Sequence, residues 1–308
     1  MARVDGRTRH YEDFYGVAEP SRDSRALLVV WGNCQAEALR ILLSSVDDLP
    51  FRTVRVPAVH ELTATDVPHV RRLAQATSIL LTQPIRTGYN DMPLGTDDVV
   101  GMLPAGGRVI RWPVVRYGGL EPFSAIVRDP VDPGADPPVV PYHDLRTLTL
   151  AAGARPDWDV DLPATTVREV SELNLAELRR REEAGTDVAA SDLIERSGAD
   201  AMHTIDHPGN PVLSALAERM LDALDAPGQV PERERPLLGT TLAPREPRVL
   251  AALGLPVERA RPHWEHAGTE IAPETVREAQ LEHYAEHPDL VQAGLDRYAE
   301  LIDLLGLR

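Results

Sequence analysis

Short apolar runs alternate with segments of helical periodicity in the first half of the chain. Residues 26–31 (ALLVVW) form an unbroken apolar run with two adjacent valines, which is typical of a strand buried on both faces. Residues 35–44 follow, with apolar positions spaced as on one face of a helix. The alternation continues with predicted strands at 51–56, 78–82 and 108–112 and a predicted helix at 59–75. This order of elements indicates a mostly parallel sheet flanked by helices.

The second half begins with a loop and is then almost entirely helical in its pattern. Residues 129–141 (DPVDPGADPPVVP) are too rich in proline to hold a helix. Beyond them the periodicity predicts helices at 142–152, 166–184, 188–197, 211–224, 247–253 and 273–305, the last with a break near Pro288. We therefore expect an α/β fold with the three layers of a flavodoxin-like protein and a helical C-terminal half.

These patterns divide the chain into five expected parts. A polar N-terminal arm (1–24), mobile or wrapped over the surface, precedes an α/β core with active-site loops (25–128). The proline-rich loop (129–141) leads to a helical part that completes the site (142–225) and then to a C-terminal helical extension (226–308).

Composition excludes several classes of function. The 308 residues carry 32 basic and 48 acidic side chains, and the net charge of −16 argues against binding to nucleic acid. The single cysteine excludes an internal disulfide and a multi-cysteine metal site, and it favours a reducing compartment. No leader-like or membrane-spanning apolar run is visible, so we expect a cytoplasmic protein without a membrane span.

The turn after the first strand carries the strongest chemical signal. Ligands of open α/β sheets bind outside the carboxyl ends of the strands, where Gly32, Asn33, Cys34 and Gln35 are expected. A thiol at the start of a helix faces the positive end of the helix dipole, which lowers its pKa. A buried structural cysteine is the competing interpretation. The polar neighbours Asn33 and Gln35 favour a functional turn, because burying them without a ligand is costly.

The loop after the strand at 78–82 carries a second signal, the sequence GYND at residues 88–91. Parallel strands of one sheet place their carboxyl-terminal loops on the same edge, so this loop can reach Cys34. Asn90 is suited to donate its amide to a developing oxyanion, with Tyr89 beside it. The same four residues are also a good turn sequence.

The segment DAMHTIDHPGN carries a third signal. His203, Asp206 and His207 cluster just before a helix for which Asn210 is the expected N-cap. Histidine suits proton transfer near neutral pH, and Asp206 or Asp200 can orient such a base. Metal binding by the two histidines and Asp206 is a weaker alternative, because no further ligand cluster lies near them in the sequence. We therefore expect no metal.

Three arginines are candidates for binding an anion. All 32 basic residues of the chain are arginine, so no lysine can act as a phosphate ligand or form a Schiff base. Arg86, Arg111 and Arg116 lie near predicted strand ends or in adjoining loops, and guanidinium groups fork onto phosphate oxygens. Ordinary surface charge is the simpler explanation for each one alone.

Taken together, three short motifs resemble a known family. GNCQ after the first strand, GYND after a later one and HPGN before a late helix are similar to the WcbI-type polysaccharide-biosynthesis family. More distantly they resemble the SGNH hydrolases and acyltransferases. The resemblance spans about residues 26–225 and implies an SGNH-like three-layer fold. It also implies coenzyme A as a ligand, in the form of acetyl-CoA as co-substrate, and acetylation of a sugar.

The sequence departs from the SGNH pattern in two places. Asn33 and Cys34 stand where those enzymes carry aspartate and the nucleophilic serine. In the last block, His203 has the Asp-x-x-His spacing, whereas His207 has the following proline. We favour His207 as the base because it matches His-Pro-x-Asn, and His203 stays the alternative.

The resulting hypothesis is an acyltransferase that moves an acyl group from coenzyme A to a carbohydrate or polysaccharide precursor. His207 is the general base, Asn90 holds the oxyanion, and Cys34 either carries the acyl group or shapes the pocket. The resemblance and the strand-end positions together suggest cofactor contacts from Gly32, Asn33, Gln35, Arg86, Tyr89, Arg111, Arg116 and Asn210. An SGNH-type esterase and a non-catalytic nucleotide- or sugar-binding protein are the alternatives. The expected partner is a small-molecule or glycan acceptor, and homo-oligomer formation is left open.

Overall fold

The computed structural model describes residues 5–18, 23–154 and 157–308, and they form two compact units. The first unit contains Met1–Val115, Leu178–Arg196 and Gly209–Leu238, and the second contains Arg116–Glu177, Ser197–Pro208 and Gly239–Arg308. Each unit therefore draws on segments that are far apart in the sequence.

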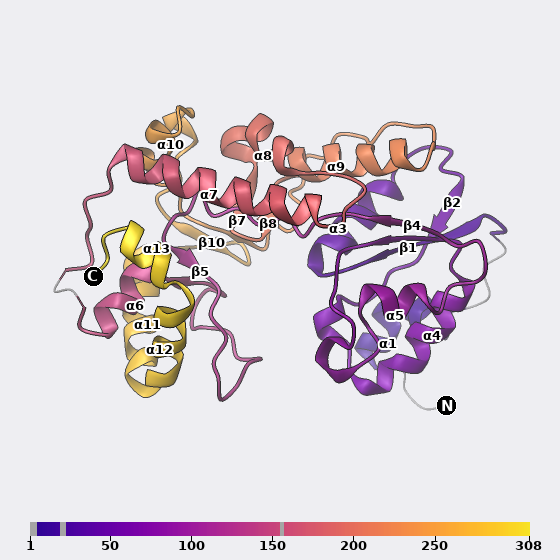
Figure 1. The fold of residues 1–308 in the computed structure, drawn as a ribbon, viewed down its shortest axis with the longest axis horizontal. Coiled ribbons are helices and arrows are strands. Elements are labelled where there is room, and N and C mark those ends of the chain that lie inside the picture. Colours follow the sequence, from indigo (N-terminus) through magenta and orange to yellow (C-terminus); the bar gives the residue numbers. More distant parts are fainter. Residues whose placement is uncertain (1–4, 19–22, 155–156) are drawn as a thin grey trace. The chain divides into compact units, whose positions relative to one another are not determined.

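A four-stranded parallel sheet forms the centre of the first unit (Figure 1). Its strands are β1 (Ala26–Trp31), β2 (Phe51–Thr53), β3 (Ile79–Thr82) and β4 (Arg108–Arg111), in the order β2-β1-β3-β4. All neighbours pair in parallel, with Trp31 opposite Thr82 and Thr82 opposite Arg111. The carboxyl ends of β1, β3 and β4 therefore meet at one edge of the sheet.

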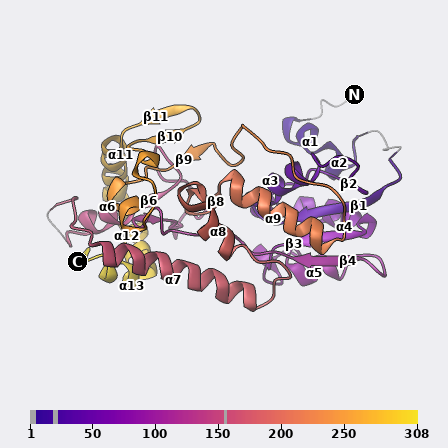
Figure 2. The ribbon, with the colours of Figure 1, turned by 90° about the horizontal axis from the view of Figure 1, so that it is seen from above.

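Helices cover both faces of this sheet. On one face α3 (Cys34–Leu43) packs against α9 (Asn210–Ala223), and on the other lie α4 (Val67–Ala76) and α5 (Thr96–Val100) (Figures 1 and 2). From Leu27 to Trp31 the apolar run of β1 is buried, because it faces helices on both sides. Its alternate residues pack with α4 in one cluster that includes Leu27, Val29, Trp31, Val70 and Leu73. The predicted α/β fold with three layers is confirmed.

The N-terminal segment is helical where the structure describes it. Two short helices, α1 (Gly6–His10) and α2 (Glu12–Tyr15), precede β1. Phe14 of α2 is fully buried in the same core as β1. Arg72 of α4 donates hydrogen bonds to two carbonyl oxygens of α2, those of Asp13 and Phe14. Residues 5–18 are thus folded onto the first unit, while 1–4 and 19–22 lie outside the described residues.

The helix expected at 59–75 begins later than predicted. Two single 3₁₀ turns, η1 (Val59–Glu61) and η2 (Ala64–Asp66), come first, and α4 starts only at Val67. Pro68 has no N–H to donate and fits only the first turn of a helix, so the regular helix begins beside it. The carboxylate of Asp66 also accepts the Thr63 N–H at 2.9 Å, which forms a capping box at the start of η2.

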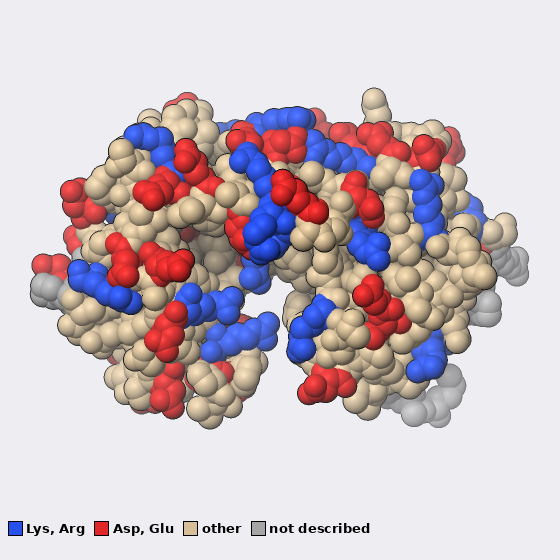
Figure 3. Space-filling view, viewed as in Figure 1, with Lys and Arg blue, Asp and Glu red and all other residues tan. Residues whose placement is uncertain are grey.

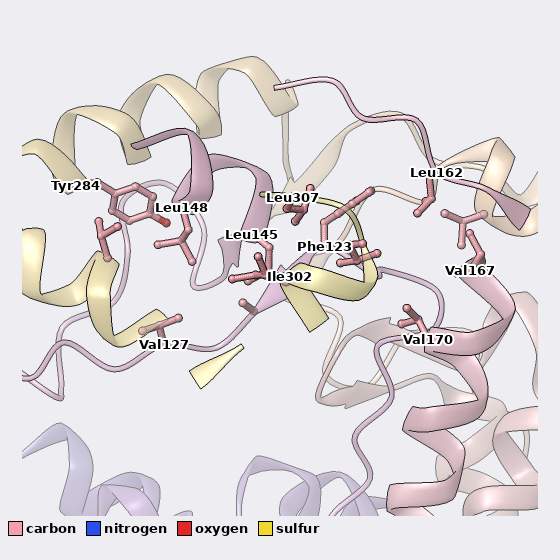
Figure 4. Close-up of a cluster of buried hydrophobic side chains, with 14 of the residues drawn as sticks. Phe123, Val127, Leu145, Leu148, Leu162, Val167, Val170, Tyr284, Ile302 and Leu307 are labelled. Atoms are coloured by element: carbon pink, nitrogen blue, oxygen red, sulfur yellow. The ribbon is translucent and has the colours of Figure 1, made fainter. Parts of the chain in front are cut away.

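Helices of the second unit surround a hydrophobic core (Figure 4). They are α6 (Leu145–Ala151), α10 (Pro247–Ala252), α11 (Pro273–Glu286), α12 (Pro288–Arg297) and α13 (Ala299–Leu304), together with the first part of α7 (Ala164–Glu183), which ends in the first unit. Leu145, Leu148 and Ile302 are fully buried in this core. The break predicted near Pro288 falls between α11 and α12, where a proline starts a new helix.

Short strands that the pattern did not predict complete the second unit. They are β5 (Ser124–Ala125) paired with β6 (His143–Asp144), β7 (Met202–Thr204) paired with β8 (His207–Pro208), and a three-stranded sheet of β9 (Thr241–Leu242), β10 (Trp264–His266) and β11 (Thr269–Ile271). Strands of two or three residues are too short to show an alternating pattern. The predicted helical C-terminal half is nevertheless confirmed.

The remaining described elements are short helices. They are α8 (Ser191–Ser197) and the single turns η3 (Tyr89–Asp91), η4 (Gly198–Asp200) and η5 (Val257–Arg259). None of the helices in the described part of the chain combines the length and the apolar character that a membrane crossing requires.

Candidate functional site

Cys34 is the first residue of the helix that follows β1. Asn33 is the N-cap of α3, and its side-chain oxygen accepts the Gln35 N–H at 3.0 Å. Cys34 is half-buried, at the edge where the parallel strands end. The predicted strand, turn and helix around this thiol are confirmed. The first N–H groups of a helix favour a negative charge beside them, so the position suits a thiolate.

Gln83 holds this turn in place by hydrogen bonds to Asn33, and it was not among the predicted site residues. Its Oε1 accepts the Asn33 N–H at 2.8 Å, and its Nε2 donates to the Asn33 side chain at 3.1 Å. Gly32 is required for this approach, because a Cβ at that position would collide with the Gln83 amide. The available signal was its position, a polar residue directly after β3 and next to the end of β1.

Gln35 is fully buried and held by protein groups. Its Nε2 donates to the Val115 carbonyl at 2.8 Å, and its Oε1 accepts the Val115 N–H at 3.1 Å. The Gln83 amide also donates to it at 3.3 Å. The side chain thus ties the start of α3 to the segment after β4. This contact accounts for the buried polarity that the sequence analysis attributed to a ligand.

Two of the predicted arginines share a pocket at the end of the sheet. Arg86 follows β3 and Arg111 ends β4, and both line a pocket of about 520 Å³ within the first unit. Arg181 of α7 lines it as well and was not predicted. Arg111 pairs with Asp97 at 3.9 Å. Elsewhere, arginine and acidic side chains are interspersed over the face shown in Figure 3. Arg116 is exposed and belongs to the second unit.

The loop with Tyr89 and Asn90 has an unusual backbone. Gly88, Asn90 and Asp91 all have positive φ angles, of 66°, 52° and 58°. The carboxylate of Asp98 fastens the loop by accepting the N–H groups of Gly88 at 2.8 Å and Gly95 at 3.0 Å. The Asn90 side chain is exposed and makes no hydrogen bond within the described residues. Non-glycine residues held in the left-handed region concentrate at functional sites.

The second unit holds His207 in a polar cluster. Tyr142 lies at its centre: its hydroxyl donates to Asp206 at 2.7 Å and lies 2.7 Å from the Thr204 hydroxyl and 3.5 Å from the His207 Nδ1. The Tyr142 ring also stacks on Trp264 at 6.0 Å between centroids. Tyr142 was missed because it comes some 60 residues earlier in the sequence than the histidine segment.

Burial controls the charges of this cluster. It lowers the pKa of His207, and the nearby Asp206 opposes that effect. Burial and the Asp206 charge raise the pKa of Tyr142 far above its usual range, so this hydroxyl stays a hydrogen-bond donor. At neutral pH the imidazole of His207 is therefore neutral, which is the form that accepts a proton.

His203 occupies a different environment. Burial, together with Arg245 and Arg261, lowers its pKa to about 4, and neither ring nitrogen has a hydrogen-bond partner within the described residues. Asp200 pairs with Arg259 at 2.8 Å and with Arg245 at 3.8 Å. The Asp-x-x-His spacing thus leads to an arginine-bound carboxylate and a weakly basic imidazole.

Asn210 does not cap α9, which corrects the sequence prediction. The N-cap is Gly209 in an extended conformation, and Asn210 is the first helical residue. The Asn210 side chain instead fastens the segment after α9: its Nδ2 donates to the Arg233 and Arg235 carbonyls at 3.1 and 3.0 Å, and its Oδ1 accepts the Leu237 N–H at 2.8 Å. Because these contacts engage the whole Asn210 amide, it does not bond to the first N–H groups of α9.

Within the described residues, no three side chains of His, Cys, Asp or Glu are grouped so that they could hold a metal ion. The chemistry available in the first unit is thus a thiol at a helix start and an arginine-lined pocket. The second unit offers a neutral histidine linked to tyrosine and aspartate.

Comparison with known proteins identifies a family and a similar solved structure. A model of the family described as polysaccharide biosynthesis enzyme WcbI matches residues 27–229. A solved structure of WcbI, described as a novel polysaccharide biosynthesis enzyme and as native protein without a disulfide bond between coenzyme A and one of its cysteines, matches with a TM-score of 0.73. It is 18% identical, and the match covers 92% of this chain and 99% of that one. No curated protein matches the chain.

The two matches differ in extent. The family match ends at residue 229, whereas the structural match takes in 92% of the chain and so continues into the C-terminal helices. The structural match supports the fold alone at this level of identity. The family match spans most of the chain and includes the turn around Cys34 and the segment of His207. The chain therefore belongs to the WcbI family of polysaccharide biosynthesis enzymes.

Proposed function

We propose that the protein transfers an acyl group, in the simplest case acetyl, from coenzyme A to a hydroxyl group of a carbohydrate or polysaccharide precursor. The observation that carries the proposal is the pairing, in one unit, of a half-buried thiol at a helix start with an arginine-lined pocket at the same edge of the sheet. Membership of a polysaccharide-biosynthesis family supports the carbohydrate acceptor.

The arginine-lined pocket fits a phosphate-rich ligand. Arg86, Arg111 and Arg181 supply guanidinium groups, which bind phosphate oxygens in pairs. Ile85 and Val114 add apolar surface for the uncharged parts of such a ligand. The pocket's volume of about 520 Å³ lies within the range of roughly 300–1,000 Å³ typical of sites for small organic ligands. Because the chain has no lysine, arginines and backbone N–H groups do all of the phosphate binding in this proposal.

Cys34 is the thiol that the proposal places next to coenzyme A. The similar WcbI structure is described in terms of a disulfide bond, absent there, between coenzyme A and a cysteine. Cys34 is the only cysteine of this chain. Two roles follow for it: covalent acyl carrier, since exchange between thioesters is nearly isoenergetic, or wall of the pocket during direct attack by the acceptor. Gln83 and Asn33 act as positioning residues in either role, because they hold the turn in place.

His207 is the proposed general base. Bound acyl-CoA supplies an activated thioester. In the transfer step the acceptor hydroxyl forms a C–O bond to the acyl carbon, the C–S bond breaks, and His207 takes the hydroxyl proton and returns it to the departing thiolate. Tyr142 and Asp206 position this histidine, and Asn90 is the proposed donor to the oxyanion.

A binding and mass experiment tests the proposal. Calorimetry with coenzyme A should give saturable binding that weakens at least tenfold in Arg86→Ala, whereas Arg71→Ala on the exposed face of α4 should bind as the native protein does. Incubation with acetyl-CoA followed by intact-mass measurement should show an added acetyl group if Cys34 is the carrier, and no addition in Cys34→Ala.

Catalysis is measured with a glycan acceptor and acetyl-CoA. His207→Ala should lower turnover by about 10²–10⁴-fold, the usual contribution of a general base, and His60→Ala at an exposed position should not. Full turnover by Cys34→Ala would eliminate the covalent route alone. Absence of coenzyme A binding, or ester hydrolysis that proceeds equally well without coenzyme A, would refute the proposed function.

A further inference from the structure

The second unit contains a pocket that the proposed roles leave unused. Its volume is about 230 Å³, and its walls include the charged residues Glu121, Arg245 and Arg261 and the aromatic residues Trp158 and Trp264. All of its lining residues belong to the second unit, the same unit that holds His207.

Glu121 is the most unusual side chain of this pocket. It is 7% exposed, and both of its carboxylate oxygens are buried without a hydrogen-bond partner within the described residues. Burial raises its pKa to about 8, although the positive charges of Arg245 and Arg261 and the nearby Ser124 side chain pull in the opposite direction. The group is therefore mostly protonated at neutral pH, and it offers one donor and one acceptor. A buried polar group with no partner lowers stability and calls for a functional explanation.

Two neighbouring side chains, Arg245 and His203, also have buried polar atoms without hydrogen-bond partners among the described residues. Arg245 is 4% exposed and donates from Nη2 to the Met202 carbonyl, but its Nε–H is buried without a partner within the described residues. His203 interacts electrostatically with Arg245, and both of its ring nitrogens lack hydrogen-bond partners in the part of the chain that the structure describes. The three residues together leave donors and acceptors unsatisfied in one region of the unit.

This mixture of donors and acceptors discriminates between ligands. In this pocket an anion would satisfy the arginines but would leave the acceptor of Glu121 unpaired, whereas a cation would pair with Glu121 but would be repelled by the arginines. A hydroxyl group both donates and accepts, so a polyol can satisfy Glu121 and Arg245 together. The volume of about 230 Å³ is several times the roughly 30 Å³ of a water molecule and is below the roughly 300 Å³ at which sites for drug-sized ligands begin. It therefore suits a ligand the size of one sugar ring.

The pocket is connected to the His207 cluster by direct contacts. Trp264 lines the pocket and stacks on Tyr142, whose hydroxyl binds Asp206 and lies beside His207. Asp206 is also close enough to Glu121 for its charge to affect that carboxyl group. A ring held beside Glu121 is thus placed next to the proposed base.

We propose that this pocket binds one sugar ring of the acceptor through its hydroxyl groups, with Glu121 and Arg245 as hydrogen-bond partners. The identification of that sugar as the acceptor rests on the proposed acyl transfer, whereas the binding itself does not. Glu121 is kept in the chain at the expense of stability because it recognises the ligand.

Glu121→Met tests the proposal, because it separates binding from folding. The methionine side chain has a similar length and no hydrogen-bonding group that needs a partner, so the variant should unfold at the native temperature or higher. Saturation-transfer NMR on the full chain without coenzyme A uses the methyl α-glycosides of glucose, mannose and galactose as probes. At least one should bind saturably, with affinity lowered tenfold or more in Glu121→Met.

Two further variants serve as a conservative substitution and as a control. Glu121→Gln keeps the ability both to donate and to accept a hydrogen bond and should bind within threefold of the native affinity. Glu258→Met makes the same change as the main variant at an exposed position of η5 and should alter neither binding nor stability. Equal binding by Glu121→Met, the absence of saturable binding by all three glycosides, or binding of inorganic phosphate in preference to them would each overturn the proposal.

Calorimetry with coenzyme A on the same samples separates this inference from the proposed function. Glu121-dependent sugar binding by a protein that does not bind coenzyme A would refute acyl transfer and keep the sugar site. Coenzyme A binding without sugar binding would refute the sugar site and would leave the proposed acyl transfer standing.

Discussion

At the scale of single residues, Gly32 and Gln83 decide how the turn before Cys34 is built. The Gln83 amide holds the Asn33 backbone and side chain at once, and it comes so close to residue 32 that no Cβ fits between them. The φ angle of Gly32 is not positive, so other residues could adopt this backbone conformation. Glycine is needed here only because the Gln83 side chain packs so closely against it. The pair links β3 to the start of α3.

Gly32→Ala should lower the free energy of unfolding by about 1–3 kcal/mol, the usual cost of inserting a methyl group into a packed site. Because the collision is with the Gln83 side chain, the double variant Gly32→Ala/Gln83→Ala should lose less than the sum of the two single losses. Urea denaturation measures all three. Gly6→Ala, where a Cβ meets nothing within 4 Å, is the control. Strictly additive losses would show that the two residues do not collide.

At the scale of elements, α3 depends on its cap. Four N–H groups at the start of a helix have no partner inside the helix, and the Asn33 side chain satisfies the one on Gln35. Cys34 lies between these two residues, so the same cap that stabilises the helix also fixes the position of the thiol.

Asn33→Ala should lower the free energy of unfolding by about 1 kcal/mol, and Asn33→Asp should retain most of the capping. The measurement is urea denaturation at neutral pH. Gln75→Ala, at an exposed position of α4, is the control and should leave the free energy of unfolding unchanged. A loss as large in the aspartate variant as in the alanine variant would contradict the capping role.

Elements with a strong local pattern could be predicted, and short ones could not. The apolar run of β1 and the break at Pro288 are properties of neighbouring residues, and both are where the sequence places them. The start of α4 was misplaced because apolar spacing continued across Pro68, and β7 with β8 was missed because two or three residues carry no pattern. The cap of α9 was assigned to Asn210 in place of Gly209 for a different reason: the Asn210 side chain bonds to residues 233–237, which are distant in the sequence.

At the scale of the whole molecule, buried histidines make stability depend on pH. Burial lowers the pKa of both His143 and His203 to about 4, and His143 also bonds to the Tyr284 hydroxyl at 2.6 Å. The unfolded chain takes up protons on these groups near pH 6.5, before the folded protein does. Their contribution to stability is therefore present above about pH 6.5 and is lost as the pH falls toward 4.

The free energy of unfolding should decrease between pH 7 and pH 4, and the double variant His143→Gln/His203→Gln should decrease less steeply over the same range. Glu121, with a raised pKa, acts in the opposite direction in both proteins, so the difference between them isolates the histidines. Urea denaturation at intervals of half a pH unit measures the slopes. His60→Gln, at an exposed position, should keep the native slope. Equal slopes in native protein and double variant would refute this origin of the acid sensitivity.

The sequence by itself determined the local chemistry: a parallel α/β core, a cysteine at the start of α3, and a histidine segment before α9. Neighbouring residues set these features, because strand propensity, helix capping and proline act over a few positions. Only the tertiary structure decided which distant groups meet. Arg181 lines a pocket with Arg86, and Tyr142 binds Asp206, while Glu121 is buried beside Arg245 without a partner among the described residues. These contacts depend on packing between segments 64 to 124 residues apart, which no local pattern records.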